Sequence, residues 1–130
     1  MKRLFAGVLV GLLLLAMVYP VASNALAQKE YKAQRFDVEV DVGPDGALLV
    51  TETVVFDFAG GPFSQVFREL PGEKVDRVEV VSATLDGVAL DRGDEAGQVE
   101  VSGGTPIEVV WHLPPTSDKT YTFTLTYRVE

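Results

Sequence analysis

One carboxylate in this sequence lies where a charge is costly. Glu52 stands among apolar residues that recur at every second position: Leu48, Val50, Val54, Phe56 and Phe58. Side chains alternate between the two faces of a strand, so Glu52 is predicted to share the face that points into the core. A buried carboxylate is unfavourable unless a cation or hydrogen-bond donors reach it. Desolvated, partnered carboxylates of this kind also occur in catalytic and ligand-binding sites.

Arg68 is the cation best placed to meet Glu52. It lies in the segment FSQVFREL (63–70), where it shares a predicted strand face with Val66 and Leu70, one short loop after the Glu52 strand. We therefore expect Glu52 and Arg68 to form an ion pair. The simpler interpretation is structural, as a core ion pair or as a carboxylate that caps the amides of a loop. The alternative is a catalytic or ligand-binding pair.

A hydrolase built on Glu52 needs a second carboxylate across a cleft, as in glycosidases. Glu39, Asp41 and Glu108 are available, but alternation places them on the solvated faces of their predicted strands. His112 is the only histidine, and the chain has no cysteine, so no transition-metal site or catalytic triad is supported. We predict no catalytic residues, no cofactor and a protein that is not an enzyme.

The loop DRGDEAG is a weak candidate for calcium. Asp91, Asp94 and Glu95, with Asp86 nearby, supply the oxygen ligands that Ca²⁺ prefers. The ordered D-x-D-x-D-G spacing of a dedicated calcium loop is missing. An acidic surface loop is therefore the simpler interpretation, and we predict no metal site.

The N-terminus predicts export. Lys2 and Arg3 precede the 15-residue apolar run 4–18, and Ala25-Leu26-Ala27 forms a small-x-small cleavage site. Residues 1–27 are therefore expected to be a cleaved signal peptide, since the run is shorter than the roughly 20 apolar residues of a membrane span. Residues 28–34 are expected to form a short polar tether, followed by a β-sandwich domain at 35–130.

The mature chain is acidic and free of cysteine. The full sequence has a formal charge of −8, and removal of the two cations Lys2 and Arg3 gives −8 − 2 = −10. Nucleic acids and anionic lipid surfaces need a basic footprint, so neither is expected as a partner. The absence of cysteine excludes disulfides and thiolate metal sites, which is typical of bacterial extracytoplasmic domains rather than disulfide-rich animal modules.

The mature chain shows strand periodicity throughout and no helical period. The expected strands are 35–42, 48–58, 63–70, 77–85, 88–90, 98–102, 107–113 and 120–129. Strand 35–42 is expected to have one apolar and one wet side, Asp86-Gly87 to form a tight hairpin turn, and Pro114-Pro115 to end strand 107–113. The pattern favours an all-β, antiparallel immunoglobulin-like β-sandwich of seven to eight strands, with Trp111 in its central core.

Three motifs in this order resemble a known family. They are DGALLVTET (45–53) followed by Phe56 and Phe58, then FRELP (67–71), and the last strand with its TYR (126–128). Together they resemble the N-terminal domain of the YciQ-like predicted membrane proteins, a domain of unknown function. The resemblance covers nearly the whole mature chain and implies an extracytoplasmic β-domain attached to a membrane protein. Since no membrane span precedes Glu130, a fragment or a secreted stand-alone version is expected.

Three classes of function stay open. The favoured one is a binding or sensing module, exported to the cell envelope or medium, that meets an unknown protein or envelope component. The second is a structural head that packs on the membrane helices of a longer form of the same protein. The third is a secreted hydrolase that uses Glu52.

Overall fold

The computed structural model describes residues 29–130, which fold into strands and turns. The predicted signal peptide, residues 1–27, lies outside the described residues. The eight strands are β1 Glu30–Val42, β2 Leu48–Ala59, β3 Phe63–Leu70, β4 Val78–Leu85, β5 Val88–Ala89, β6 Val99–Ser102, β7 Ile107–Thr116 and β8 Lys119–Val129. Across residues 29–130 we find no helix that could cross a membrane. The predicted all-β class is confirmed.

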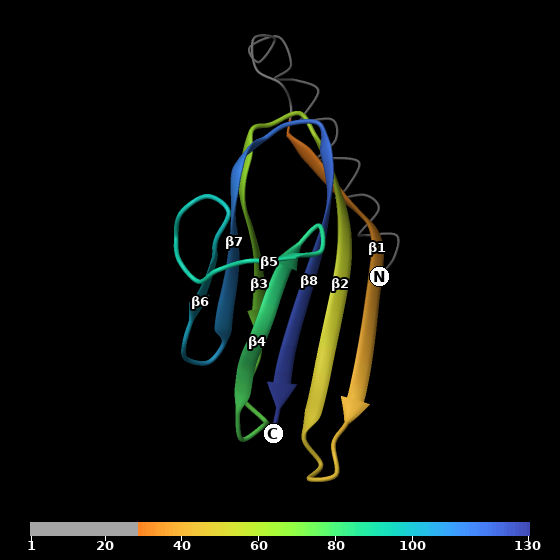
Figure 1. Ribbon diagram of the computed structural model, residues 1–130, viewed down its shortest axis with the longest axis vertical. Coiled ribbons are helices and arrows are strands. Elements are labelled where there is room, and N and C mark those ends of the chain that lie inside the picture. Colours follow the sequence, from red (N-terminus) through yellow and green to blue (C-terminus); the bar gives the residue numbers. More distant parts are fainter. Residues whose placement is uncertain (1–28) are drawn as a thin grey trace, which may run out of the picture.

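Two antiparallel sheets pack against each other as a sandwich. The larger sheet has the order β1-β2-β8-β4-β5 and the smaller has the order β3-β7-β6. Figure 1 shows β4, β8, β2 and β1 side by side, with β1 at the edge far from β6 and β7. Because five strands face three, the smaller sheet covers only part of the inner side of the larger one.

The hydrophobic core fills the space between the sheets. Its buried members are Phe58, Leu70, Val80, Ala83, Val99, Val109, Trp111, Leu113, Tyr121, Phe123 and Leu125. Trp111 lies within this core, and its ring meets Phe123 edge to face with 5.6 Å between centroids. The Trp111 Nε1–H donates a hydrogen bond to the Thr84 carbonyl at 3.2 Å, so the buried indole N–H has a partner.

Two connections between the sheets lie together at one end of the sandwich, where β2 leads into β3 and β7 leads into β8 (Figure 1). The Gly60 N–H donates to Asp118 Oδ1 at 2.8 Å, and the Asp118 N–H donates to the Gly60 carbonyl at 3.2 Å. A side chain at Gly61 would lie 2.7 Å from the Thr116 carbonyl, so only glycine fits this close approach. These contacts hold the two connections together at the point where the chain passes from β2 in the larger sheet to β3 in the smaller sheet.

β1 is longer than the sequence predicted. Residues 30–34 were expected to be part of a tether, but they extend the strand because β2 is long enough to pair with them as far as Ala59. Tyr31 packs edge to face on Phe56, with ring centroids 5.8 Å apart. A bulge between Ala33 and Arg35 shifts the register within the added segment.

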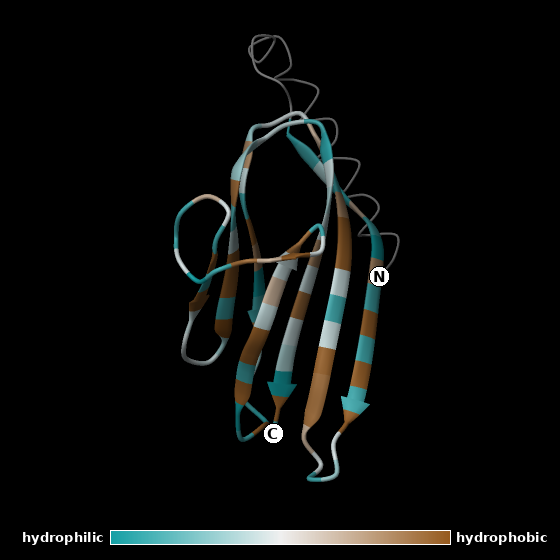
Figure 2. Cartoon of the chain, in the orientation of Figure 1, coloured by the Kyte–Doolittle hydropathy of each residue, from teal (hydrophilic) through white to brown (hydrophobic). Residues whose placement is uncertain are grey.

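The sequence predicted that strand 35–42 is wet on one side only, and this is wrong, because both sides of β1 are exposed. Phe36, Val38 and Val40 lie opposite Val54, Glu52 and Val50 of β2, so they point to the inner side of the larger sheet. They nevertheless keep 54%, 52% and 49% of their surface exposed, because no strand of the smaller sheet lies over β1. Figure 2 shows the apolar and polar residues that alternate along this uncovered strand.

The prediction that Pro114-Pro115 ends the seventh strand is also wrong. β7 continues to Thr116, which pairs with Phe63 of β3. Proline lacks the N–H that a ladder needs, but both prolines lie in the stretch of β7 where the register with β3 shifts, and both are exposed. The Thr116 hydroxyl donates to the Pro114 carbonyl at 2.6 Å, so the segment keeps a local hydrogen bond.

We expect Leu125→Ala to destabilise the domain by about 2–5 kcal/mol, because Leu125 is buried in the core and truncation leaves a cavity. Leu49→Ala is the matched control, since Leu49 is 40% exposed on the outer side of β2, and it should change stability by less than about 0.5 kcal/mol. The measurement is the free energy of unfolding from urea titrations. Similar losses in both variants would contradict the assigned inner and outer sides of the larger sheet.

Candidate functional site

Glu52 lies on the inner side of β2, at the boundary between the core and the uncovered strand. Its neighbours in the sheet are Val38 of β1 and Leu125 of β8. Only 5% of Glu52 is exposed, whereas Val38 beside it is half exposed and Leu125 is buried. The strand phase predicted from the alternating residues is therefore the observed one.

Arg68 and Tyr127 supply the hydrogen bonds that Glu52 needs. Arg68 reaches across from β3 in the other sheet and binds the carboxylate through one edge of its guanidinium, where Nε donates to Oε1 and Nη2 donates to Oε2, each at 2.9 Å. The Tyr127 hydroxyl of β8 donates to Oε2 at 2.7 Å. The structure thus brings Glu52 and Arg68 together and adds Tyr127, which the sequence analysis named only as part of the last strand.

The contact between Tyr127 and Glu52 could have been predicted from the sequence. It occurs in phase with the apolar residues of the last strand, so its hydroxyl was bound to lie near the core. A buried tyrosine hydroxyl usually finds a hydrogen-bond partner. In this sequence the carboxylate predicted on an inner face, that of Glu52, was the natural acceptor.

The pKa values of this cluster reflect its contacts. Burial alone raises the pKa of Glu52, but the hydrogen bonds from Arg68 and Tyr127 outweigh it and hold the pKa below its ordinary value. The hydrogen bond to Glu52 raises the pKa of Arg68 above its already high value. Burial and the hydrogen bond to Glu52 raise the pKa of Tyr127 to about 12. Glu52 and Arg68 are therefore charged, and Tyr127 is protonated, at neutral pH.

The Glu52–Arg68–Tyr127 cluster links the two sheets by hydrogen bonds and an ion pair. Both Glu52 oxygens are occupied by donors, and the guanidinium of Arg68 also donates from Nη1 to the Glu69 carbonyl at 2.6 Å. A general acid at neutral pH needs a raised pKa, which is the opposite of what Glu52 has. The geometry is that of a satisfied polar cluster at the rim of a core.

A shallow apolar groove adjoins the cluster on its open side. Two hollows of about 230 and 160 Å³ share Phe56, Val66 and Phe67 as lining residues. The larger reaches Tyr31 near the start of β1, and the smaller reaches the Glu52–Arg68 pair. Each hollow is below the roughly 300–1,000 Å³ of a typical small-molecule site, and the shared lining residues join the two into one elongated apolar groove.

The weak calcium candidate does not assemble. Within residues 29–130, no three acidic or histidine side chains converge on a point that could hold a metal ion, so Asp91, Asp94 and Glu95 form no such cluster. Asp86 has a structural use, because its Oδ1 accepts the Thr122 N–H at 2.8 Å at the Asp86-Gly87 turn. Both residues of that turn have positive φ, 50° and 80°, as expected for a tight hairpin.

Three of the four remaining candidates lie on the surface, whereas the side chain of His112 is only 13% exposed. Glu39, Asp41 and Glu108 are all exposed. His112 meets Glu100 of the neighbouring strand, with Nε2 and Oε1 2.9 Å apart, a pair that the sequence analysis missed. Strand register decides this contact, and register cannot be read from local periodicity.

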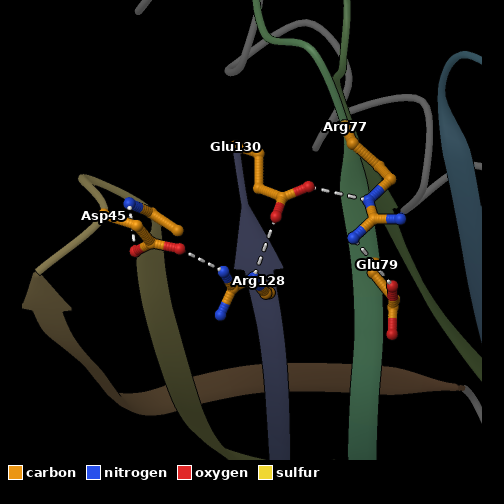
Figure 3. A network of polar contacts seen from close by, with 6 residues as sticks. Asp45, Arg77, Glu79, Arg128 and Glu130 are labelled. Carbon is orange, nitrogen blue, oxygen red and sulfur yellow. Dashed lines mark hydrogen bonds and ion pairs between the residues drawn. The ribbon is translucent and has the colours of Figure 1, made fainter. Parts of the chain in front are cut away.

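A second polar cluster joins the strand ends near residue 130, as Figure 3 shows. Arg128 contacts Asp45 at 2.7 Å and Glu130 at 3.2 Å, and Arg77 contacts Glu130 at 2.9 Å and Glu79 at 3.6 Å. The hydrogen bond from the Ala47 N–H is the main cause that holds the pKa of Asp45 below its usual value, and the nearby charge of Arg128 lowers it further. These exposed pairs contribute little stability each and weaken with salt, but together they connect the β1–β2 turn with β8 and β4.

Comparison with known proteins places the chain in a family. Residues 32–130 match the model of the family described as "Predicted membrane protein (DUF2207) N-terminal domain". The chain belongs to this family. The matched range, residues 32–130, includes all eight strands except the first two residues of β1, and it contains Glu52, Arg68 and Tyr127.

Matches to individual proteins add little to the family assignment. No curated protein matches the chain. Among solved structures, a crystal structure of a two-domain M1 zinc metallopeptidase mutant bound to L-tryptophan aligns with 80% of this chain at 20% identity and a TM-score of 0.49. The alignment covers 21% of that protein, far less than its full length.

We expect Glu52→Gln to destabilise the domain by roughly 1–3 kcal/mol, because it removes the charge that Arg68 and Tyr127 bind. The loss should be smaller than for a fully buried pair, since the Arg68 side chain is 41% exposed. Glu108→Gln, on an exposed position, should change little. Thermal and urea unfolding measure both. Equal, small effects would contradict a supporting role for the pair.

The same variant has a distinct acid response. The pKa of Glu52 is lowered by folding from a reference of 4.5, so its contribution is present above that pH and is lost as the pH falls through the folded value. The stability difference between wild type and Glu52→Gln should therefore shrink on acidification. A difference that stays constant down to strong acid would contradict the lowered pKa.

Tyr127→Phe should cost about 1–3 kcal/mol at neutral pH, since it removes a hydrogen bond to a charged group. Folding raises the pKa of Tyr127 from 10.0 to about 12, so its contribution is full below pH 10 and is lost as the pH rises toward 12. The stability gap between wild type and variant should narrow over that window. Tyr31→Phe, at a position 69% exposed, is the control and should change stability at neutral pH by less than about 0.5 kcal/mol.

Proposed function

We propose that this domain is a non-catalytic protein-binding module, displayed outside the cytoplasmic membrane as part of a membrane protein. The observation that carries the proposal is β1, whose thirteen residues are all exposed although one of its sides is apolar. Monomeric proteins rarely leave contiguous apolar surface of this kind without a use. Membership of a family of predicted membrane proteins supports the cellular setting.

The binding surface in this proposal combines the inner side of β1 with the groove. Phe36, Val38, Val40 and Val42 are between 49% and 71% exposed, and Phe67 across the groove is 66% exposed. The free edges of β1 and β3 offer backbone groups to an added strand, while the apolar side chains offer contact area. A partner protein that supplies an extended, apolar segment fits both features.

A non-catalytic role agrees with the state of Glu52. Its carboxylate is bound by Arg68 and Tyr127, its pKa is lowered, and the exposed carboxylates Glu39 and Asp41 lie on the outer side of the sheet rather than facing it across a cleft. A hydrolase would require Glu52 to face a second carboxylate with room for substrate between them.

A second candidate follows from the family description. As the N-terminal domain of a membrane protein, the domain could use the same apolar side to rest on the membrane-spanning part of its own chain. A photoreactive group at Phe36 distinguishes the two: cross-links within one chain indicate the structural head, and cross-links between chains indicate the binding module.

Cysteine labelling in cells tests the proposal, because the chain has no cysteine of its own. Val40→Cys places a thiol on the proposed surface, and Val88→Cys places a control thiol on β5, at the opposite edge, where Val88 is 64% exposed. Each full-length variant is treated with a membrane-impermeant maleimide, once in spheroplasts and once as purified, dilute protein.

We expect Val88→Cys to react equally fast in both settings and Val40→Cys to react severalfold more slowly in spheroplasts, where a partner covers it. Equal rates for Val40→Cys in the two settings would show that the surface is free in the cell. Reaction of Val88→Cys in the purified protein but not in spheroplasts would show that the domain is not extracytoplasmic.

A further inference from the structure

β1 has the longest free edge in the described part of the molecule. It is thirteen residues long and pairs only with β2. The other edge strands are shorter: β5 has two residues, β6 has four and β3 has eight. Natural sheets protect their edges with short strands, prolines, bulges or inward-pointing charges. β1 has no proline, a single bulge near its start and apolar residues on its inner side.

The charges of β1 are divided along its length. Lys32 and Arg35 lie in the first half, and Asp37, Glu39 and Asp41 follow in the second. The acidic residues lie opposite outward-facing residues of β2, so they line the outer side of the free edge. Glu30, at the first position of the strand, is the single acidic residue in the basic half.

This division favours one orientation for a strand of the same sequence. A parallel copy of β1 would place three carboxylates beside three carboxylates, and like charges directly opposite are destabilising. An antiparallel copy places the basic half of each strand beside the acidic half of the other. The strand is thus complementary to itself in the antiparallel direction.

We propose that β1 pairs antiparallel with the β1 of a second copy of this chain, so that two five-stranded sheets join across a twofold axis. The inference deepens the proposed function, since it rests on the same exposed strand and names one partner for it. Pairing gives hydrogen-bond partners to the free backbone groups of β1 and brings the apolar residues of the two strands into contact. Such an interface is isologous, the commonest arrangement in homodimers.

The net negative charge of the domain opposes association, but it acts differently from the charges on β1. The acidic residues elsewhere are spread over the surface, and their repulsion across distances beyond the Debye length of about 8 Å is screened at physiological ionic strength. The charges on two paired strands lie closer than that. Local complementarity therefore decides the orientation.

Cross-linking of the full chain tests both the pairing and its direction. Tyr31→Cys and Val42→Cys place single thiols near opposite ends of β1, at positions 69% and 71% exposed. The two positions are eleven residues apart, roughly 36 Å along an extended strand. An antiparallel pair brings residue 31 of one copy near residue 42 of the other and keeps equal residues far apart.

We expect a short bis-maleimide to cross-link a mixture of the two variants and to leave each variant alone uncross-linked. Cross-links within each single variant, absent from the 31–42 combination, would establish a parallel pair and overturn the proposal. A monomer by light scattering at every concentration tested would also overturn it. Protection of Val40→Cys in cells would still support the proposed function in that case, with another protein as the partner.

Charge reversal on the strand gives a second readout. Lys32→Glu with Arg35→Glu makes β1 wholly acidic and should abolish the dimer in light scattering. Lys74→Glu with Lys119→Glu changes the net charge equally at positions outside β1, and it should leave the dimer intact. Loss of the dimer in both would assign the effect to net charge and overturn the role of β1.

Complementation completes the test. A variant with Glu30→Lys, Asp37→Lys, Glu39→Lys and Asp41→Lys has a wholly basic β1 and should be monomeric alone. Mixed with the wholly acidic variant, it should form a heterodimer that neither forms with itself. A mixture that stays monomeric would contradict pairing through these residues.

Discussion

The smaller sheet is two strands narrower than the larger one, and cover over the inner side of the larger sheet ends at β2. Glu52 lies at that boundary, with buried Leu125 on one side and half-exposed Val38 on the other. Arg68, on the edge strand β3 of the smaller sheet, reaches the carboxylate across the space between the sheets. The Glu52–Arg68 pair therefore marks the edge of the hydrophobic core. The apolar groove and the free strand β1 lie beyond it, on the side away from the core. The unequal width of the sheets thus determines where the ion pair, the groove and the exposed edge lie.

The electrostatics of the boundary favour a structural role for the pair. A carboxylate that loses solvent is destabilised, and here a bidentate guanidinium and a tyrosine hydroxyl more than offset that loss, so the pKa of Glu52 falls. Arg68 keeps part of its side chain in water, which limits the desolvation cost of the cation. The pair therefore joins the sheets without requiring two fully buried charges. An acid or base that takes part in catalysis would need a freer carboxylate than this one.

Local sequence patterns predicted a large part of this structure, and the errors share one cause. Alternation gave Glu52 its face, the position of Arg68 one loop later gave its partner, and Asp86-Gly87 marked a hairpin that the structure contains. The exposure of β1 and the contact of Tyr127 with Glu52 depend on which strands become neighbours. Strand order and register join residues far apart in the chain, 75 positions in the case of Tyr127 and Glu52. Alternation of apolar and polar residues along a strand predicts which residues share a face, but it does not predict which other strands cover that face.

An antiparallel β1 pair would turn two half-open grooves into one feature. In an antiparallel pair the directly opposed side chains lie on the same side of the sheet, so both smaller sheets would stand on the same side of the joined sheet. The inner sides of the two β1 strands would form the floor between them, and the two β3 edges would form the walls. That floor would be two strands wide, roughly 10 Å at the usual strand spacing, and apolar along Phe36, Val38 and Val40 of each copy. A dimer would therefore occupy the backbone edge of β1 but enlarge the apolar part of the protein-binding surface, and the edge of β3 would stay open to a further partner in the trough.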